Sequence, residues 1–81
     1  MAEKLRNILE TEFDNINIDV EEMPNGRFSG SVVWAGFAGM DDIDRQNKIR
    51  NVLKRDLGPE VQLVGVLLTY TPDELTAMSA A

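Results

Sequence analysis

The sequence predicts an α+β fold in which a small three-stranded sheet has helices packed on one face. Apolar residues recur at helical spacing in residues 2–13 and again in residues 43–57. Alternating or continuous apolar runs, which are typical of strands, occupy residues 16–21, 27–35 and 61–69. The resulting order of helix, strand, strand, helix, strand, helix suits a layered α+β architecture, and a chain of 81 residues is expected to form one domain.

The first helix and the first two strands follow from short-range patterns. Four apolar residues recur at helical spacing with polar residues between them: Leu5, Ile8, Leu9 and Phe13. After Asn15, apolar and polar residues alternate through Val20, which predicts a half-buried strand. Pro24-Asn25-Gly26 is a turn signal, and the β-formers after it predict a second strand, so a hairpin is expected.

The second helix, residues 43–57, is predicted by charges at its start and an apolar stripe along its length. Three aspartates crowd its start, where carboxylates suit the helix dipole and cap free amides: Asp41, Asp42 and Asp44. The buried stripe is expected at four positions: Ile49, Val52, Leu53 and Leu57. Gly58-Pro59 is a stop signal and predicts the C-terminal end of this helix.

The last strand and helix are predicted from the final third of the chain. Residues 61–69 are almost continuously apolar, which is typical of a strand buried on both faces in the middle of a sheet. Thr71, Pro72 and Glu74 then form a capping box with proline at the first helical position, so a short last helix is expected.

The composition excludes several classes of function. The chain has no histidine and no cysteine, so disulfides, thiolate or imidazole metal ligands and the usual near-neutral general base are absent. We therefore expect no enzyme, no cofactor and no metal; the aspartates of residues 41–44 lack the spacing of an EF-hand and are interpreted as helix caps. No signal peptide and no apolar stretch of about 20 residues is visible, so a cytoplasmic protein is expected.

Two segments carry a family pattern. Phe28 and Phe37 are nine residues apart, Phe37-Ala38-Gly39 forms an F-x-G motif, and Arg45-Gln46-Asn47 follows after five residues. The last segment reads Thr69-Tyr70-Thr71-Pro72-Asp73-Glu74. In order and spacing this resembles the BolA-like family. Its members have Arg-His-Arg where this chain has residues 45–47, and their last strand ends in a Thr-x-Thr-Pro-x-Glu segment. The resemblance covers about residues 5–76 and implies a fold related to the type II KH domain; it is expected to fail if residues 61–69 form an edge strand or a helix.

The chain departs from this family at the positions that matter for iron. BolA-like proteins can share a [2Fe-2S] cluster with a monothiol glutaredoxin through a histidine at the start of the last strand, which is Leu63 in this sequence. A second ligand, histidine or cysteine, usually lies in the loop that corresponds to residues 22–26, and Gln46 replaces the histidine of the triplet. The resemblance therefore implies a member that has lost the cluster chemistry.

The function expected from these observations is a non-catalytic interaction or regulatory module whose partner is another protein. The candidate interaction surface is Gly36, Phe37, Gly39, Arg45, Gln46, Asn47, Lys48, Arg50, Lys54 and Arg55. One alternative is a KH-like nucleic-acid binder that uses the G-x-x-G loop and basic helix face of residues 36–55, although a net charge of −6 disfavours it and the glycines also suit a turn. A further alternative is an apo-type partner of a monothiol glutaredoxin.

Overall fold

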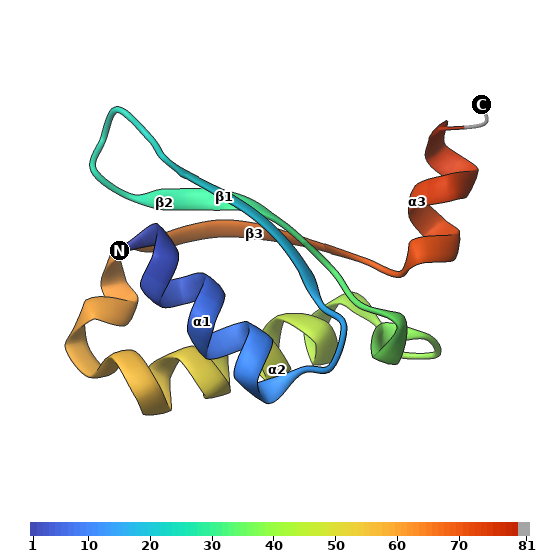
Figure 1. Ribbon diagram of the computed structural model, residues 1–81, viewed down its shortest axis with the longest axis horizontal. Helices are drawn as coiled ribbons and strands as arrows, with labels where there is room; N and C mark the ends of the chain where they lie inside the picture. Colours follow the sequence, from blue (N-terminus) through green and yellow to red (C-terminus); the bar gives the residue numbers. More distant parts are fainter. Residues whose placement is uncertain (80–81) are drawn as a thin grey trace.

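The predicted order of elements is confirmed by a computed structural model, which describes residues 1–79. Its helices and strands, with two short 3₁₀ helices, are α1 (Ala2–Glu12), β1 (Asn17–Glu22), β2 (Phe28–Val33), η1 (Ala35–Phe37), α2 (Asp42–Leu57), η2 (Gly58–Leu63), β3 (Val64–Tyr70) and α3 (Pro72–Ser79) (Figure 1). Within the described residues no helix is both long and apolar enough to cross a membrane.

The sheet is mixed and has the order β1-β2-β3, so β2 is the central strand. β1 and β2 form the expected antiparallel hairpin, in register from Asn17 opposite Val33 to Glu22 opposite Phe28. Its turn contains Gly26 at φ 82°, a conformation that glycine adopts without strain. β3 runs parallel to β2, because the chain crosses over through α2 before it returns to the sheet.

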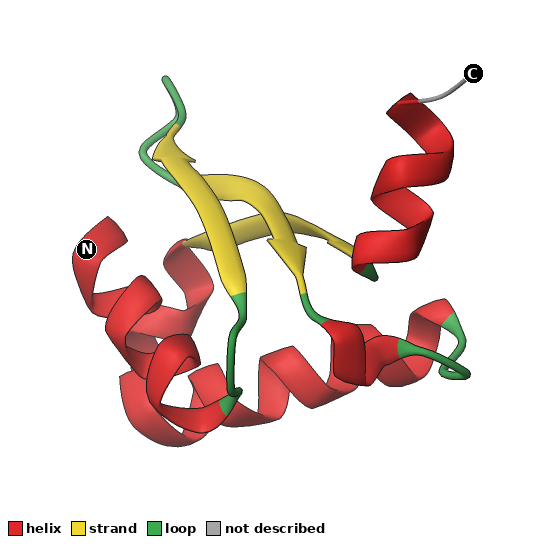
Figure 2. Cartoon of the chain, turned by 45° about the vertical axis from the view of Figure 1, so that its right-hand side comes forward, coloured by secondary structure: helices red, strands yellow, loops and turns green. Residues whose placement is uncertain are grey.

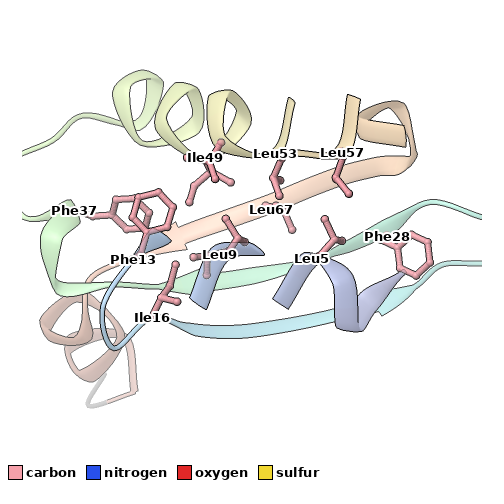
Figure 3. Packing of buried hydrophobic residues seen from close by; sticks show 12 residues of the cluster. Leu5, Leu9, Phe13, Ile16, Phe28, Phe37, Ile49, Leu53, Leu57 and Leu67 are labelled. Carbon is pink, nitrogen blue, oxygen red and sulfur yellow. The ribbon is translucent and has the colours of Figure 1, made fainter. Parts of the chain in front are cut away.

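Helices α1 and α2 cover one face of the sheet and leave the other face bare (Figures 1 and 2). The core lies between these helices and the sheet, where side chains from α1, α2 and all three strands or their flanks meet (Figure 3). Its fully buried members include Leu5, Leu9, Val32, Phe37, Ile49 and Leu53. α3 stands at the end of β3, on the side away from α1 and α2, and has no buried residue.

The expectation for residues 61–69 is wrong in two respects. The strand begins only at Val64, because the first three residues of the apolar run belong to η2, which follows the end of α2. The strand is also at an edge of the sheet and not in its middle. Since none of the described helices covers the face of the sheet opposite α1 and α2, Val66 and Leu68 are 65% and 51% exposed. The apolar run of residues 61–69 therefore does not indicate a strand that is buried on both faces of the sheet.

The helix ends are confirmed by their hydrogen bonds. The Asp41 carboxylate accepts from the backbone N–H of Asp44 at 2.9 Å and caps α2. At α3, the N–H of Glu74 donates to the Thr71 hydroxyl at 3.1 Å, and the N–H of Thr71 donates to the Glu74 carboxylate at 3.0 Å. This reciprocal pair is the predicted capping box.

Candidate interaction site

A groove of about 500 Å³ lies between α2 and the start of β3. Its floor is apolar, with Ile49 and Leu53 on α2 facing Leu67 on β3 (Figure 3). Its rim carries three cations and two amides: Arg27, Arg50, Lys54, Gln46 and Gln62. Among the described residues, no carboxylate lines this basic groove.

The regular spacing of α2 positions three of the five rim residues. Gln46, Arg50 and Lys54 follow one another at intervals of four residues, so they share one face of the helix. The side-chain amide of Gln46 donates to the Leu67 carbonyl at 2.8 Å, which fixes α2 against β3. Arg27 reaches the same groove because the parallel register sets the start of β2 beside the start of β3.

The three groove cations are free of carboxylates in a protein whose net charge is −6. Of the other five basic side chains, three are paired with carboxylates, as in the exposed pair of Lys4 and Glu60 at 3.2 Å. Within residues 1–79, no ion pair includes Arg27, Arg50 or Lys54. Three of the eight basic residues of the chain therefore meet at one apolar groove with their charge available to an anionic partner.

The expectation that Arg45 lies on an exposed basic surface is wrong, because Arg45 is only 7% exposed. Its guanidinium donates two hydrogen bonds to the Glu74 carboxylate, at 2.7 and 2.8 Å, and its Nε donates to the Met40 carbonyl at 3.0 Å. The two bonds from Arg45 to Glu74, together with the bond from the Thr71 N–H, lower the pKa of Glu74 to about 2. Arg45 thus joins α2 to α3 and is not available to a partner.

The G-x-x-G loop lies outside the basic groove. Phe37 is fully buried in the core, where its ring meets Trp34 edge-on with centroids 5.1 Å apart, so the prediction that Phe37 belongs to an exposed interaction surface is wrong. Gly36 and Gly39 are exposed, and Gly39 has φ 80° in the turn that leads into α2. The loop is followed by the Asp41 cap at the N-terminus of α2, whereas the groove lies farther along this helix.

The remaining predicted site residues are exposed on α2 but do not line the groove: Asn47, Lys48 and Arg55. The Lys48 ammonium lies 6.0 Å from the centroid of the Trp34 ring. Arg55 donates to Asp56 at 2.9 Å and to Glu12 at 3.1 Å, and both bonds raise its pKa. Of the predicted surface, the structure brings together only Gln46, Arg50 and Lys54.

Arg27 and Gln62 belong to the groove and were not predicted from the sequence. A signal for Arg27 exists, since a strand, a helix and a strand in succession form a crossover that pairs the two strands in parallel. Parallel pairing sets the residue before the second strand beside the start of the third. Gln62 lies in η2, in a stretch whose sequence predicts a strand, so its position at the groove was not predicted.

The positions that the resemblance assigns to cluster ligands carry no imidazole and no thiolate. Leu63, at the end of η2, is 43% exposed, and Met23 is the sole sulfur-bearing residue in residues 22–26. Within residues 1–79 there is no group of three or more histidine, cysteine, aspartate or glutamate residues arranged to hold a metal ion. A thioether and aliphatic groups do not replace the imidazole or thiolate ligands of a [2Fe-2S] cluster.

Comparison with known proteins gives matches by structure alone. No family model matches the sequence, and no curated protein matches it. The BolA domain of SufE1 from Arabidopsis thaliana superposes with a TM-score of 0.73 at 23% identity, over 89% of this chain and 92% of that domain. BolA1 from the same plant gives 0.69 at 22% identity, over 90% of this chain and 93% of its own.

A bacterial structure agrees with the two plant structures. A bolA protein homologue from Coxiella burnetii has a TM-score of 0.68 and 26% identity, over 94% of this chain and 96% of the homologue. These matches confirm the resemblance that the sequence indicates. They hold although β3 is an edge strand, so the condition that tied the resemblance to a central last strand was wrong.

Proposed function

We propose that this BolA-like protein is a non-catalytic interaction module that binds an acidic segment of another protein in the basic groove. The observation that carries the proposal is the set of three unpaired cations around an apolar floor in an acidic chain. The groove volume of about 500 Å³ lies in the range of clefts that bind ligands on proteins. A segment with carboxylates beside apolar residues complements both the rim and the floor.

The chemistry of the lining supports binding over catalysis. The groove is lined by aliphatic residues, glycine, two amides, two arginines and one lysine. Arginine stays protonated, and a side-chain amide is neutral and too weakly basic to accept a proton at neutral pH, so neither serves as a general base. The lysine, Lys54, is exposed to solvent and lacks the desolvation that activates catalytic amines. No hydroxyl, thiol, imidazole or carboxylate nucleophile is among the lining residues.

The same lining favours a protein partner over single-stranded nucleic acid. Sites for unpaired bases combine cations with aromatic side chains on which the bases stack, and no aromatic residue lines the groove. The G-x-x-G loop is at the start of α2 and has Asp41 and Asp42 directly after it, which oppose phosphate. A glutaredoxin without its cluster remains one candidate for the protein partner.

A titration of the whole chain with two anionic probes tests this proposal. One probe is a synthetic peptide of aspartate and leucine residues, and the other is single-stranded oligouridine. We expect the peptide to shift the backbone amide signals of Arg50, Lys54 and Leu67, and to lose part but not all of its affinity as salt rises, because salt screens the rim charges and does not weaken contact with the apolar floor. Oligouridine that binds more tightly than the peptide at moderate salt would contradict the proposal and favour the nucleic-acid alternative.

A further inference from the structure

The bare face of the sheet forms a second, separate surface. Strand alternation sends Ile18 and Val20 toward the core and turns Asp19 and Glu21 to the opposite side. A shallow hollow of about 480 Å³ lies on this side. We call it the outer face and define it by the residues that line it: Asp19, Glu21, Met23, Ser29, Gly30, Ser31, Val66 and Leu68.

Each of the three strands contributes a row of side chains with a different chemistry to the outer face. β1 carries the carboxylates of Asp19 and Glu21. On β2, Ser31 lies opposite Asp19 and Ser29 opposite Glu21, so the middle of the hollow is small and polar. β3, at the far edge, carries Val66 and Leu68 with more than half of each side chain in water. Among the described residues, no cation lines the outer face.

Two raised segments close the ends of the outer face. Figure 1 shows the β1–β2 turn at one end and α3 at the other, both on the side away from α1 and α2. α3 also carries two exposed apolar side chains, Leu75 and Met78, which are three residues apart on the helix and do not line the hollow. Three strands about 4.8 Å apart form a sheet surface about 10 Å wide, which is close to the diameter of one α-helix.

From this arrangement we propose that the outer face docks a basic amphipathic helix of a partner protein. The apolar stripe of that helix covers Val66 and Leu68, and lysines or arginines on its flank meet Asp19 and Glu21. Its position supplies the missing second layer of the sheet, as α1 and α2 do on the other face. This proposal does not depend on the basic groove, which lies between α2 and β3 and has the opposite charge.

Other occupants fit the outer face less well. Anionic lipid headgroups are repelled by the carboxylates of β1. A second copy of this chain brings a net charge of −6 toward another of −6. Pairing of two β3 edges is also opposed, because the free-edge carbonyl of Leu67 accepts from Gln46, and that of Thr69 faces the Arg45 guanidinium at 3.4 Å.

The test uses the whole chain and a synthetic helical peptide of leucine and lysine, about 14 residues and about 21 Å long. A peptide of the same pattern with glutamate in place of lysine is the charge control. We expect the lysine peptide to bind and to shift the amide signals of β1 and β3. We expect Val66→Ser with Leu68→Ser, or Asp19→Asn with Glu21→Gln, to weaken binding about tenfold or more.

Matched variants separate this surface from general charge attraction and from the basic groove. Glu10→Gln with Asp73→Asn removes two exposed carboxylates elsewhere, and Arg50→Ala with Lys54→Ala alters the groove. Both pairs should leave the affinity for the lysine peptide within about twofold of the original. Circular dichroism checks that each variant keeps the fold.

Four results would overturn the proposal. The first is equal affinity for the glutamate and lysine peptides, and the second is a loss of affinity in the Glu10→Gln and Asp73→Asn variant equal to that in the outer-face variants. The third is a dimer of the original chain that dissociates when Val66→Ser and Leu68→Ser are introduced. The fourth is binding of anionic vesicles through the same residues. The third would assign the outer face to a second copy, and the fourth would assign it to a membrane.

Discussion

Arg45 and Glu74 form a bidentate ion pair, with Nη1 to Oε1 at 2.7 Å and Nη2 to Oε2 at 2.8 Å. The arginine side chain is buried and that of Glu74 is nearly half exposed. α3 has no buried residue, and this pair joins its first turn to α2, while the capping box with Thr71 holds the Glu74 carboxylate in place. Arg45, which was expected on the contact surface, therefore stabilises the contact between two helices of the fold.

The pair predicts a pH-dependent contribution to stability. The pKa of Glu74 is lowered to about 2 in the folded state, so the pair stabilises the protein above the ordinary carboxyl pKa near 4.5 and loses its effect as the pH falls through about 2. We expect Glu74→Gln to be less stable than the original protein at pH 7, with a difference that shrinks below pH 4.5. Urea unfolding followed by fluorescence of Trp34, the single tryptophan, measures it.

The neighbouring variant Asp73→Asn serves as the control, because it removes a carboxylate outside the Arg45 pair. Its loss of stability at pH 7 should be smaller than that of Glu74→Gln. A difference between Glu74→Gln and the original protein that stayed constant from pH 7 to pH 2 would refute the assigned role of the pair.

Gly30 is predicted to tolerate no side chain. A Cβ at this position would collide with the backbone of Asp19 and Val20 in the neighbouring strand β1. We expect Gly30→Ala to lower the free energy of unfolding by about 2–3 kcal/mol, since the backbone of a hairpin gives way less easily than a side chain.

Gly26→Ala gives the comparison for Gly30→Ala. Gly26 lies in the β1–β2 turn with φ 82°, and a Cβ added there would meet no atom within 4 Å, so only backbone strain of about 1 kcal/mol is expected. A larger loss at Gly26 than at Gly30, measured by the same unfolding experiment, would be inconsistent with the close approach of the two strands.

The two faces of the sheet are predicted to differ in their sensitivity to truncation. Leu9 on α1 is fully buried between the helices and the sheet, and Leu9→Ala should cost about 3–5 kcal/mol. Leu68→Ala on the outer face should cost less than about 1 kcal/mol, because half of that side chain is already in water. Equal losses at the two positions would mean that the outer face is covered in the isolated chain.

Local patterns predicted the elements of this fold because their causes lie close together in the sequence. The Asp41 cap, the capping box of Thr71 and Glu74 and the turn at Gly26 each depend on groups within four residues of one another. The predicted first helix, residues 2–13, differs from α1 by one residue at its end.

The edge position of β3 depends on pairing between distant segments and is not visible in its own composition. A continuous apolar run is compatible with burial on both faces or with an exposed docking surface, and the choice depends on what covers the sheet. The same long-range contacts bring Arg27 to the groove through the pairing of Phe28 with Val64.

The burial of Arg45 was predictable in part. Arg45 precedes Ile49 by four residues and Leu53 by eight, so helical periodicity places it on the buried stripe of α2 and not on the exposed face. Periodicity does not reveal that Glu74, 29 residues later, compensates its charge. A charged residue on an apolar stripe is thus a signal for a distant partner.

The most direct test of the proposed function compares two double variants that change the net charge equally. Arg50→Ala with Lys54→Ala removes two unpaired cations from the basic groove, whereas Lys4→Ala with Arg55→Ala removes two cations that are paired elsewhere. Calorimetric titration with the aspartate–leucine peptide should show affinity about tenfold or more weaker for the groove variant and within about twofold of the original for the other. Equal losses in the two variants, or no loss in the groove variant, would contradict the assignment of the basic groove as the partner site.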